Sequence, residues 1–269
     1  MTLSIVMATR NYGRYLNEAI ASIYDQSLDD WKLYIADYGS TDGSISILQS
    51  WMTADPVRIK AYFPDKSRPA GSISHSLAAL AADDSPEGKY PLRAINLLIE
   101  MLKGSPDTLY LMKFDPDDIL LPDRLAEMVN GFKERTRVVF STFQNANTKG
   151  IAVGKVADLT EWFEKAPEEC LIPEPHIVRR DALDRLDIWT YDWDTYGPLA
   201  VWERALRILS EYGPDAFAYH TPGRPAFLYR QHPGQLSQTP MVQAWADQRK
   251  RVNDEYWARV EEKGGIVKE

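Results

Sequence analysis

The sequence has little of several features that would define its class. Its one cysteine, Cys170, cannot form a disulfide within the chain, which suits a reducing compartment. No apolar run approaches the ~20 residues that cross a bilayer. Residues 1–7 enter a strand-like run directly, without a basic region and a cleavage site. We therefore expect a cytoplasmic protein with no transmembrane segment and no export signal.

Positive charge is also in the minority. The chain has 31 Lys and Arg against 39 Asp and Glu, which gives a net charge of −8 and a pI near 5.2. Binding to nucleic acid or anionic lipid depends on neutralising phosphates, so this balance argues against both as general partners. Arg179, Arg180 and Arg185 come nearest to a basic patch, but such runs are usually solvated, and we assign them no function.

Apolar runs alternate with helical stripes along the first half of the chain. Residues 3–8 and 31–36 are short and nearly continuously apolar, as is typical of parallel strands covered on both faces. Between them, apolar residues recur at helical spacing from Leu16 to Tyr24. The same alternation predicts further strands at residues 57–62, 109–114 and 138–143. The pattern indicates an α/β fold with a mostly parallel sheet.

Polar residues follow three of these strands where ligands collect in open α/β sheets, outside the carboxyl ends. Asn11, Asp37 and Asp115 occupy these places. Extended geometry would put Asp115 and Asp117 on one side, where several carboxylates suit Mg²⁺ or Mn²⁺. Taken alone, however, the D-P-D-D run at residues 115–118 favours an Asp-rich surface turn with helix caps.

Four segments, taken in order, resemble the family 2 glycosyltransferases of the GT-A fold. They are residues 4–11 (SIVMATRN), 35–44 (IADYGSTDGS), 114–118 (FDPDD) and 229–237 (YRQHPGQLS). The second is the most specific, being similar to hydrophobic-x-Asp-Asp-Gly-Ser-Thr-Asp. The resemblance covers most of residues 3–237. It implies a Rossmann-like, mostly parallel sheet flanked by helices, with a C-terminal acceptor-side elaboration and a terminal helix.

The resemblance also implies a domain organisation. We expect one GT-A domain over residues 1–238, with a nucleotide-sugar-binding half at 1–145 and an acceptor-side half at 146–238. A C-terminal helix and tail follow at 239–269. The irregular segment at residues 63–90 reads as an insertion around one short helix, at about 74–82.

By the same resemblance, one set of residues binds the donor. Thr9 and Asn11 lie against the nucleotide, and Asp37 accepts a charge-assisted hydrogen bond from the base. The full donor-binding set is Thr9, Asn11, Asp37, Arg93, Asn96, Asp115 and Arg230. For Asp37 the alternative is a turn or helix cap, and for Arg93 a solvated helix arginine.

The resemblance places a divalent cation, Mn²⁺ or Mg²⁺, on Asp115, Asp117 and His232, with a UDP-sugar as the favoured donor. Three departures from the family pattern leave the donor open. Ala8 replaces a common proline, Tyr38 replaces the second Asp of the signature, and the stretch from Val57 to Asp115 is longer than usual. Tyr38 either stacks on the base or packs in its loop.

An inverting transfer also needs a base for the acceptor hydroxyl. The family carries an acidic pair before a helix with Leu-x-x-Arg, and Asp192 and Asp194 precede the helix predicted after Pro198. We prefer Asp194, with Asp192 second. The alternative for Asp194 is a cap or a salt bridge to Arg185 or Arg204.

These observations predict a metal-dependent inverting glycosyltransferase. Two alternatives stay open, a nucleotidyltransferase acting on sugar phosphates and a nucleotide- or sugar-binding module without turnover. The acceptor is not specified, since a glycan, a lipid-linked sugar, a protein and a modified nucleobase all fit.

Overall fold

The computed structural model describes residues 2–83, 91–157, 175–196, 199–220 and 224–235, with single positions at 252, 254, 256, 258 and 262. The strands are β1 (Thr2–Thr9), β2 (Trp31–Asp37), β3 (Ile59–Tyr62), β4 (Thr108–Lys113), β5 (Ile119–Leu120), β6 (Val138–Ser141), β7 (Phe143–Ala146), β8 (Ala152–Val156), β9 (His176–Arg179), β10 (Phe217–His220) and β11 (Phe227–Arg230). The helices are α1 (Gly13–Tyr24), α2 (Ser44–Ala54), α3 (Ile73–Ala81), α4 (Leu92–Lys103), α5 (Arg124–Asn130), α7 (Arg180–Leu186), α8 (Trp193–Tyr196), α9 (Ala200–Tyr212) and the 3-10 turn η2 (Pro214–Ala216).

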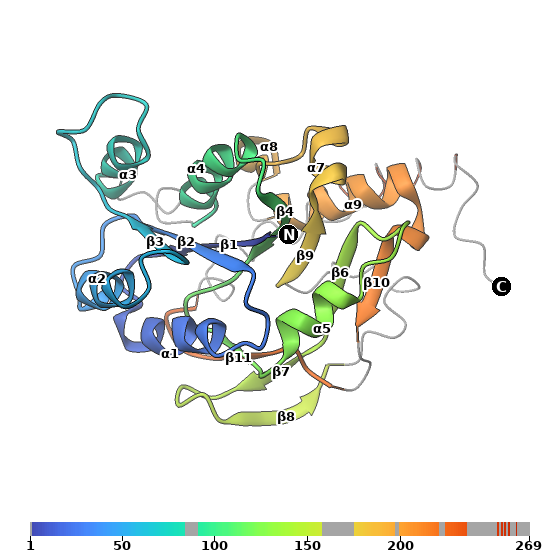
Figure 1. Ribbon diagram of the computed structural model, residues 1–269, viewed down its shortest axis with the longest axis horizontal. Coiled ribbons are helices and arrows are strands. Elements are labelled where there is room, and N and C mark those ends of the chain that lie inside the picture. The colour runs from blue at the N-terminus through green and yellow to red at the C-terminus, as the bar shows by residue number, and fades with distance from the viewer. Residues whose placement is uncertain are drawn as a thin grey trace.

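A seven-stranded sheet in the order β10-β6-β9-β4-β1-β2-β3 forms the centre of the molecule. Every neighbouring pair is parallel except the two that β9 makes with β4 and β6. Figure 1 shows this sheet edge-on between two layers of helices. The prediction of an α/β fold with a mostly parallel, helix-flanked sheet is therefore confirmed.

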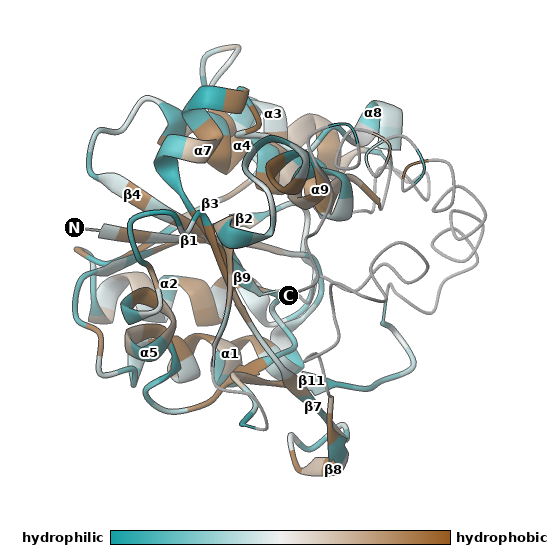
Figure 2. Cartoon of the chain, turned by 90° about the vertical axis from the view of Figure 1, so that its right-hand side faces the viewer, coloured by the Kyte–Doolittle hydropathy of each residue, from teal (hydrophilic) through white to brown (hydrophobic). Residues whose placement is uncertain are grey.

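Both faces of the sheet are buried, as the continuous apolar runs predict. Ile5 and Met7 of β1 pack in the core under α1 and α5, whereas Val6 and Ala8 pack in the core under α4 and α9. Figure 2 shows α1, α2 and α5 on one side of the sheet and α3, α4, α7 and α9 on the other. Each fully buried Ile or Met side chain contributes about 1.5–3 kcal/mol, so burial on both faces stabilises the central strands.

The chain departs from the predicted strands after β6. The strand expected at residues 138–143 stops at Ser141, and Phe143 begins β7 in a second sheet ordered β5-β11-β7-β8. The sequence also predicts a hairpin from about residue 149 to Val156. The structure forms it from β7 and β8, so its first strand lies before the predicted range. The helix expected to open at Pro122 begins at Arg124, because Asp123 has a left-handed backbone (φ 65°) that a helix cannot contain.

The third strand also starts later than expected, at Ile59. The Asp55 carboxylate accepts the backbone N–H groups of Val57 (3.2 Å) and Arg58 (2.9 Å), which turns the chain just before the strand. Val57 consequently lies outside the sheet, 71% exposed.

Some predictions fall outside the described residues, among them the segment around Trp162 and most of the C-terminal helix and tail at 239–269. Two single positions there are informative. Val252 and Tyr256 are each 2% exposed in the core beside α9, and the Tyr256 hydroxyl hydrogen-bonds Glu203. They point inward, as the apolar spacing predicts. No helix within the described ranges is both long and apolar enough to cross a membrane.

Candidate active site

Three adjacent parallel strands bring the predicted site residues to one edge of the sheet. Thr9 at the end of β1 pairs in register with Asp37 at the end of β2. On the other side of β1, Val6 pairs with Lys113, the last residue of β4, and Asp115 follows two residues later. The donor residues and the acidic loop (residues 115–118) therefore start from the same edge.

Asp37 is fully buried and only half satisfied. Its Oδ1 accepts the backbone N–H groups of Gly39 (3.0 Å) and Ser40 (2.9 Å). Its Oδ2, and the hydroxyl of Thr9 opposite, have no hydrogen-bond partner among the described residues. Leaving a buried carboxylate oxygen unpaired is costly, so the pair indicates a place for an external hydrogen-bond donor. The alternative role of Asp37, as a turn or helix cap, thus explains the hydrogen bonds of Oδ1 but leaves Oδ2 without an explanation.

Asn11 connects the loop after β1 to the loop after β2 by hydrogen bonds. Its backbone is left-handed (φ 64°), which asparagine tolerates better than most residues. Its Oδ1 accepts the Thr41 N–H at 2.7 Å, and its own N–H donates to the Ser40 hydroxyl at 2.9 Å. Contact with the nucleotide stays a prediction for Asn11, whose side-chain oxygen is used inside the protein.

Tyr38 packs in the core. Its ring is 2% exposed and belongs to the same cluster as Leu77 of α3, the helix inside the predicted insertion. Next to it, Gly39 has φ +112°, and a Cβ there would meet the Ala81 Cβ at 2.9 Å. The insertion thus covers the position where the family has its second aspartate, which explains an aromatic residue there.

The acidic loop is a turn, so the extended geometry expected at residues 115–117 is wrong. The Asp118 N–H approaches the Asp115 carbonyl at 3.4 Å, and the two predicted metal carboxylates face different partners. The Lys113 ammonium lies 2.8 Å from Asp115 Oδ1, while Asp117 Oδ2 lies 2.9 Å from His232 Nε2.

Burial and neighbouring charge in the acidic loop raise the pKa values of two groups, Asp118 and Tyr12. Burial raises the pKa of Asp118 well above its usual range, and the negative charges of Asp117 and Asp115 raise it further. Burial also raises the pKa of Tyr12, with Asp117 as the largest charge contribution. Lys113 offsets part of this negative charge from within the protein. The negative charge of Asp115 and Asp117 that raises the pKa of Asp118 would also attract a cation to this loop.

The hydrogen bonds of His232 define its tautomer. The Gly234 N–H approaches Nδ1 at 3.2 Å, and a backbone amide can only donate. Nδ1 is therefore unprotonated, and the proton sits on Nε2, which donates to Asp117. Serving as a metal ligand through Nε2 would require the other neutral tautomer. That role stays a prediction.

The donor set is compatible with Mn²⁺ or Mg²⁺. In the described part of the chain, no group of three or more His, Cys, Asp or Glu is arranged to hold a metal. Mg²⁺, however, is often held by one or two carboxylates, with waters and substrate phosphates completing its shell. Asp115 and Asp117 supply two carboxylates within one loop, whereas His232 Nε2 is hydrogen-bonded to Asp117 and would have to give up that bond to bind a metal.

Arg93 and Asn96, predicted to face the donor together, have different partners. Asn96 uses both ends of its amide on the Tyr191 backbone, at 2.7 and 2.9 Å. Arg93 lies 3.8 Å from Asp83 and 3.7 Å from Asp194. Asn96 thereby positions the segment that leads to the acidic pair, and the Arg93 guanidinium lies beside one member of that pair.

The two residues of the acidic pair have different roles: Asp192 caps a helix, and Asp194 has an exposed carboxylate. Asp192 Oδ1 accepts the Thr195 N–H at 3.0 Å, as an N-cap of α8 does. The Asp194 side chain is 91% exposed, and its ion-pair partner is Arg93. Neither expected partner pairs with it, because Arg185 pairs with Glu211 and Arg204 bonds Tyr191 and Trp189. Asp194 is thus the freer of the two.

The sequence of the donor side matches a known family. The model of Glycosyl transferase family 2 covers residues 4–83, which include Thr9, Asn11 and Asp37. This segment is similar to the family 2 glycosyltransferases. The acidic loop, Asp194 and His232 lie outside the matched segment.

Curated glycosyltransferases align with this chain over part of their length. An uncharacterized glycosyltransferase of Haemophilus influenzae is 29% identical over 128 residues, 48% of this chain and 41% of that protein. The putative glycosyltransferase EpsE of Bacillus subtilis is 29% identical over 136 residues, 50% of this chain and 39% of that protein. The aligned segments thus span less than half of these relatives.

Solved structures share the fold over nearly the whole chain. S. aureus TarS 1–349 in complex with UDP-GlcNAc has a TM-score of 0.59 at 12% identity, covering 97% of this chain and 73% of that one. Mannosyltransferase PcManGT from Pyrobaculum calidifontis, in complex with GDP-Man and Mn²⁺, has a TM-score of 0.54 at 14% identity, covering 98% and 65%. These likenesses confirm the GT-A fold.

Proposed function

We propose that this chain is a metal-dependent inverting glycosyltransferase that moves a sugar from a nucleoside diphosphate sugar, with a UDP-sugar favoured, to an acceptor hydroxyl. The observation that carries the proposal is the juxtaposition at one sheet edge of two buried, unpaired oxygens and an acidic loop. The oxygens, Thr9 Oγ1 and Asp37 Oδ2, suit the base and ribose end of a donor. The acidic loop suits the diphosphate with its cation.

On the donor side, Asp37 Oδ2 accepts an N–H of the base. A carboxylate bonded to a ring N–H is stronger than a neutral pair, and the bond removes the cost of the unpaired buried oxygen. Structural relatives support a nucleotide at this edge, since TarS was solved with UDP and PcManGT with GDP-Man.

Asp115, Asp117 and His232 would hold Mn²⁺ or Mg²⁺, which stabilises the negative charge that develops on the departing diphosphate. Lys113 adds a fixed positive charge beside Asp115. Asp194 acts as the base. The acceptor oxygen bonds to the anomeric carbon, the bond from that carbon to the diphosphate breaks, and the acceptor proton passes to the Asp194 carboxylate.

The loop after β1 disfavours the alternative of a nucleotidyltransferase. Those enzymes usually hold phosphate on free amides of a glycine-rich loop there. In this chain the Gly13 N–H at the start of α1 donates to Asp42 Oδ2 at 2.9 Å. A carboxylate of the protein therefore already uses the amide that a phosphate would need.

A panel of nucleotide sugars incubated with the protein and Mn²⁺ tests the proposal, with the released nucleoside diphosphate as the readout. We expect slow hydrolysis of a UDP-sugar that stops when EDTA removes the cation. A parallel incubation with nucleoside triphosphates and sugar 1-phosphates tests the alternative, since release of pyrophosphate there would identify a nucleotidyltransferase. No turnover in either incubation would support the binding module.

Asp37→Asn is expected to weaken UDP binding about 10- to 100-fold, the value of one hydrogen bond to a charged group, with a smaller effect on kcat. Asparagine keeps an oxygen for the Gly39 and Ser40 amides, so the loop is retained. Calorimetry with UDP measures the change. Asp42→Asn is the control, since Asp42 also caps this region through Gly13 and Ser44. If both variants lose the same affinity for UDP, Asp37 acts by holding the loop and does not contact the base.

A further inference from the structure

Arg230 is one of the most buried side chains of the protein. It ends β11, is 1% exposed, and lies on the second sheet beside the acidic loop. The resemblance predicts that it contacts the donor diphosphate. A phosphate contact requires N–H groups that point to the ligand, so the direction of its donors is decisive.

The donors of Arg230 point into the protein. Nε donates to the Asp117 carbonyl (2.7 Å), Nη1 to the Thr148 carbonyl (3.1 Å) and Nη2 to Glu18 Oε2 (2.6 Å). Its backbone N–H donates to Asp118 Oδ1 at 3.1 Å. One residue thus links α1, the acidic loop, the β7–β8 turn and β11.

The ring of Tyr15 covers one face of the Arg230 guanidinium, and the backbone at Gly150 lies close to its Nη1. Its carbon lies 4.8 Å from the centre of the Tyr15 ring, a cation–π contact. Gly150 has φ +73°, and a Cβ there would lie 3.0 Å from Glu18 Oε1 and 3.2 Å from Arg230 Nη1. The β7–β8 turn therefore closes over the ion pair.

We propose that Arg230 and Glu18 form a positioning pair that holds the acidic loop at the sheet edge, and that Arg230 does not contact the diphosphate. The inference rests on the proposed function and adds an assignment to its site. Arg230 fixes the main chain at Asp117, while His232, two residues further on, fixes the carboxylate of Asp117. Glu18 supplies the counter-charge that a buried guanidinium needs.

Glu18→Ala tests the pair most cleanly. The Glu18 side chain is 52% exposed on a helix, so alanine is compatible with that helix, and Glu18 carries no positive charge with which to bind a phosphate itself. Because a displacement of about 1 Å at a reacting centre can cost up to ~10²-fold, we expect kcat to fall about 10- to 100-fold. Affinity for UDP in the absence of metal should equal that of the parent. Hydrogen exchange of the amides at residues 114–119 should accelerate.

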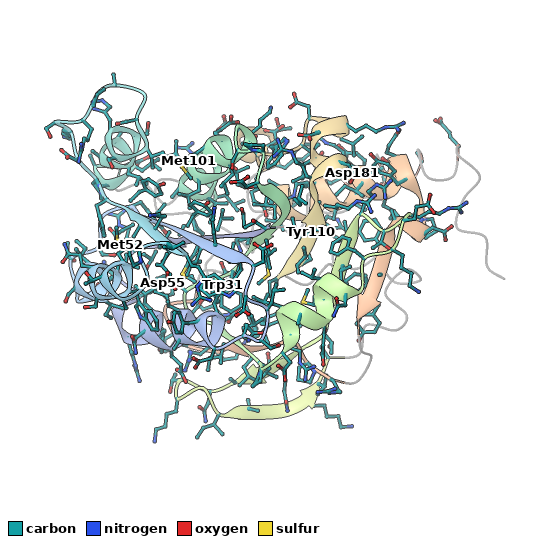
Figure 3. The ribbon with its side chains drawn as sticks, viewed as in Figure 1. Trp31, Met52, Asp55, Met101, Tyr110 and Asp181 are labelled. Atoms are coloured by element: carbon teal, nitrogen blue, oxygen red, sulfur yellow. The ribbon has the colours of Figure 1, made fainter. Side chains whose placement is uncertain are left out.

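Asp55→Ala is the matched control. Asp55 also pairs with an arginine that lies against an aromatic ring: Arg58 is 2.7 Å away, and its guanidinium lies 4.5 Å from the Trp31 ring centre. Asp55 accepts two backbone N–H groups as well, so its loss should destabilise the fold at least as much. Figure 3 labels Asp55 and Trp31 in the lower left part of the view. Trp31 begins β2, so this pair lies at the opposite end of that strand from Asp37. Losing it should lower the melting temperature and leave kcat and the exchange at 114–119 unchanged.

The remaining outcomes separate the two roles of Arg230. In Arg230→Lys, positioning predicts a lower kcat with parent affinity for metal-free UDP. Weaker metal-free UDP binding in Arg230→Lys, with parent behaviour of Glu18→Ala, would overturn the proposal and make Arg230 a diphosphate contact. Exchange at 114–119 needs no turnover, so it tests the pair even if no nucleotide sugar is a substrate. Parent exchange rates in Glu18→Ala would overturn the proposal by themselves.

Discussion

Asp117→Asn is expected to lower the rate of sugar transfer about 10²–10³-fold, the range seen when one group that stabilises transition-state charge is removed. The Asp117 carboxylate is buried, lies 2.9 Å from His232, and belongs to the loop predicted to hold the cation. The fold should survive, because the carbonyl of Asp117, and not its carboxylate, bonds Arg230. Initial rates across a Mn²⁺ titration measure the effect.

Asp123→Asn serves as the control for this change. Asp123 is an exposed acid at the start of α5 with a left-handed backbone that asparagine also adopts. It should keep the parent rate and metal dependence. Transfer by Asp117→Asn at the parent rate with an unchanged Mn²⁺ titration would remove Asp117 from the metal site.

Asp194→Asn is expected to lower kcat about 10²-fold or more, because the amide keeps the size of the side chain but cannot take the acceptor proton. The exposed carboxylate of Asp194 can be approached by an acceptor from solvent. A base acts on the acceptor alone, so affinity for UDP and Mn²⁺ should stay at the parent value. Single-turnover rates and calorimetry separate the two effects.

Asp192→Asn is the comparison. Its oxygen caps α8 through Thr195, a bond that asparagine preserves, so this variant should transfer sugar at nearly the parent rate. If Asp192→Asn loses turnover and Asp194→Asn does not, Asp192 is the base. Parent rates in both variants would place the base elsewhere and end the role of this segment.

The sequence predicts the strands that are long apolar runs, but it does not predict the short ones. β1, β2 and β4 are runs of six to eight residues buried on both faces, and the sequence shows them directly. β9 has four residues, with His176 at one end and Arg179 at the other, and lies antiparallel in the middle of the sheet. Its short apolar part carries no period, so the sequence did not reveal it.

The sequence predicts which candidate residues follow strand ends, but it does not predict their contacts. Thr9 and Asp37 follow strand ends, and their register follows from parallel pairing. The orientation of Arg230 depends on Glu18, which is 212 residues away along the chain, and no local pattern contains it. Lys113 did carry a signal, as the one charged residue of β4 (TLYLMK), two residues before Asp115.

Binding of UDP with and without Mn²⁺, measured by calorimetry on the parent chain, tests the central claim most directly. The account predicts that UDP binds in both conditions, more tightly with Mn²⁺, and that Asp117→Asn abolishes the gain while Asp37→Asn weakens binding in both. An affinity for UDP that changes neither with Mn²⁺ nor with either substitution would contradict this account.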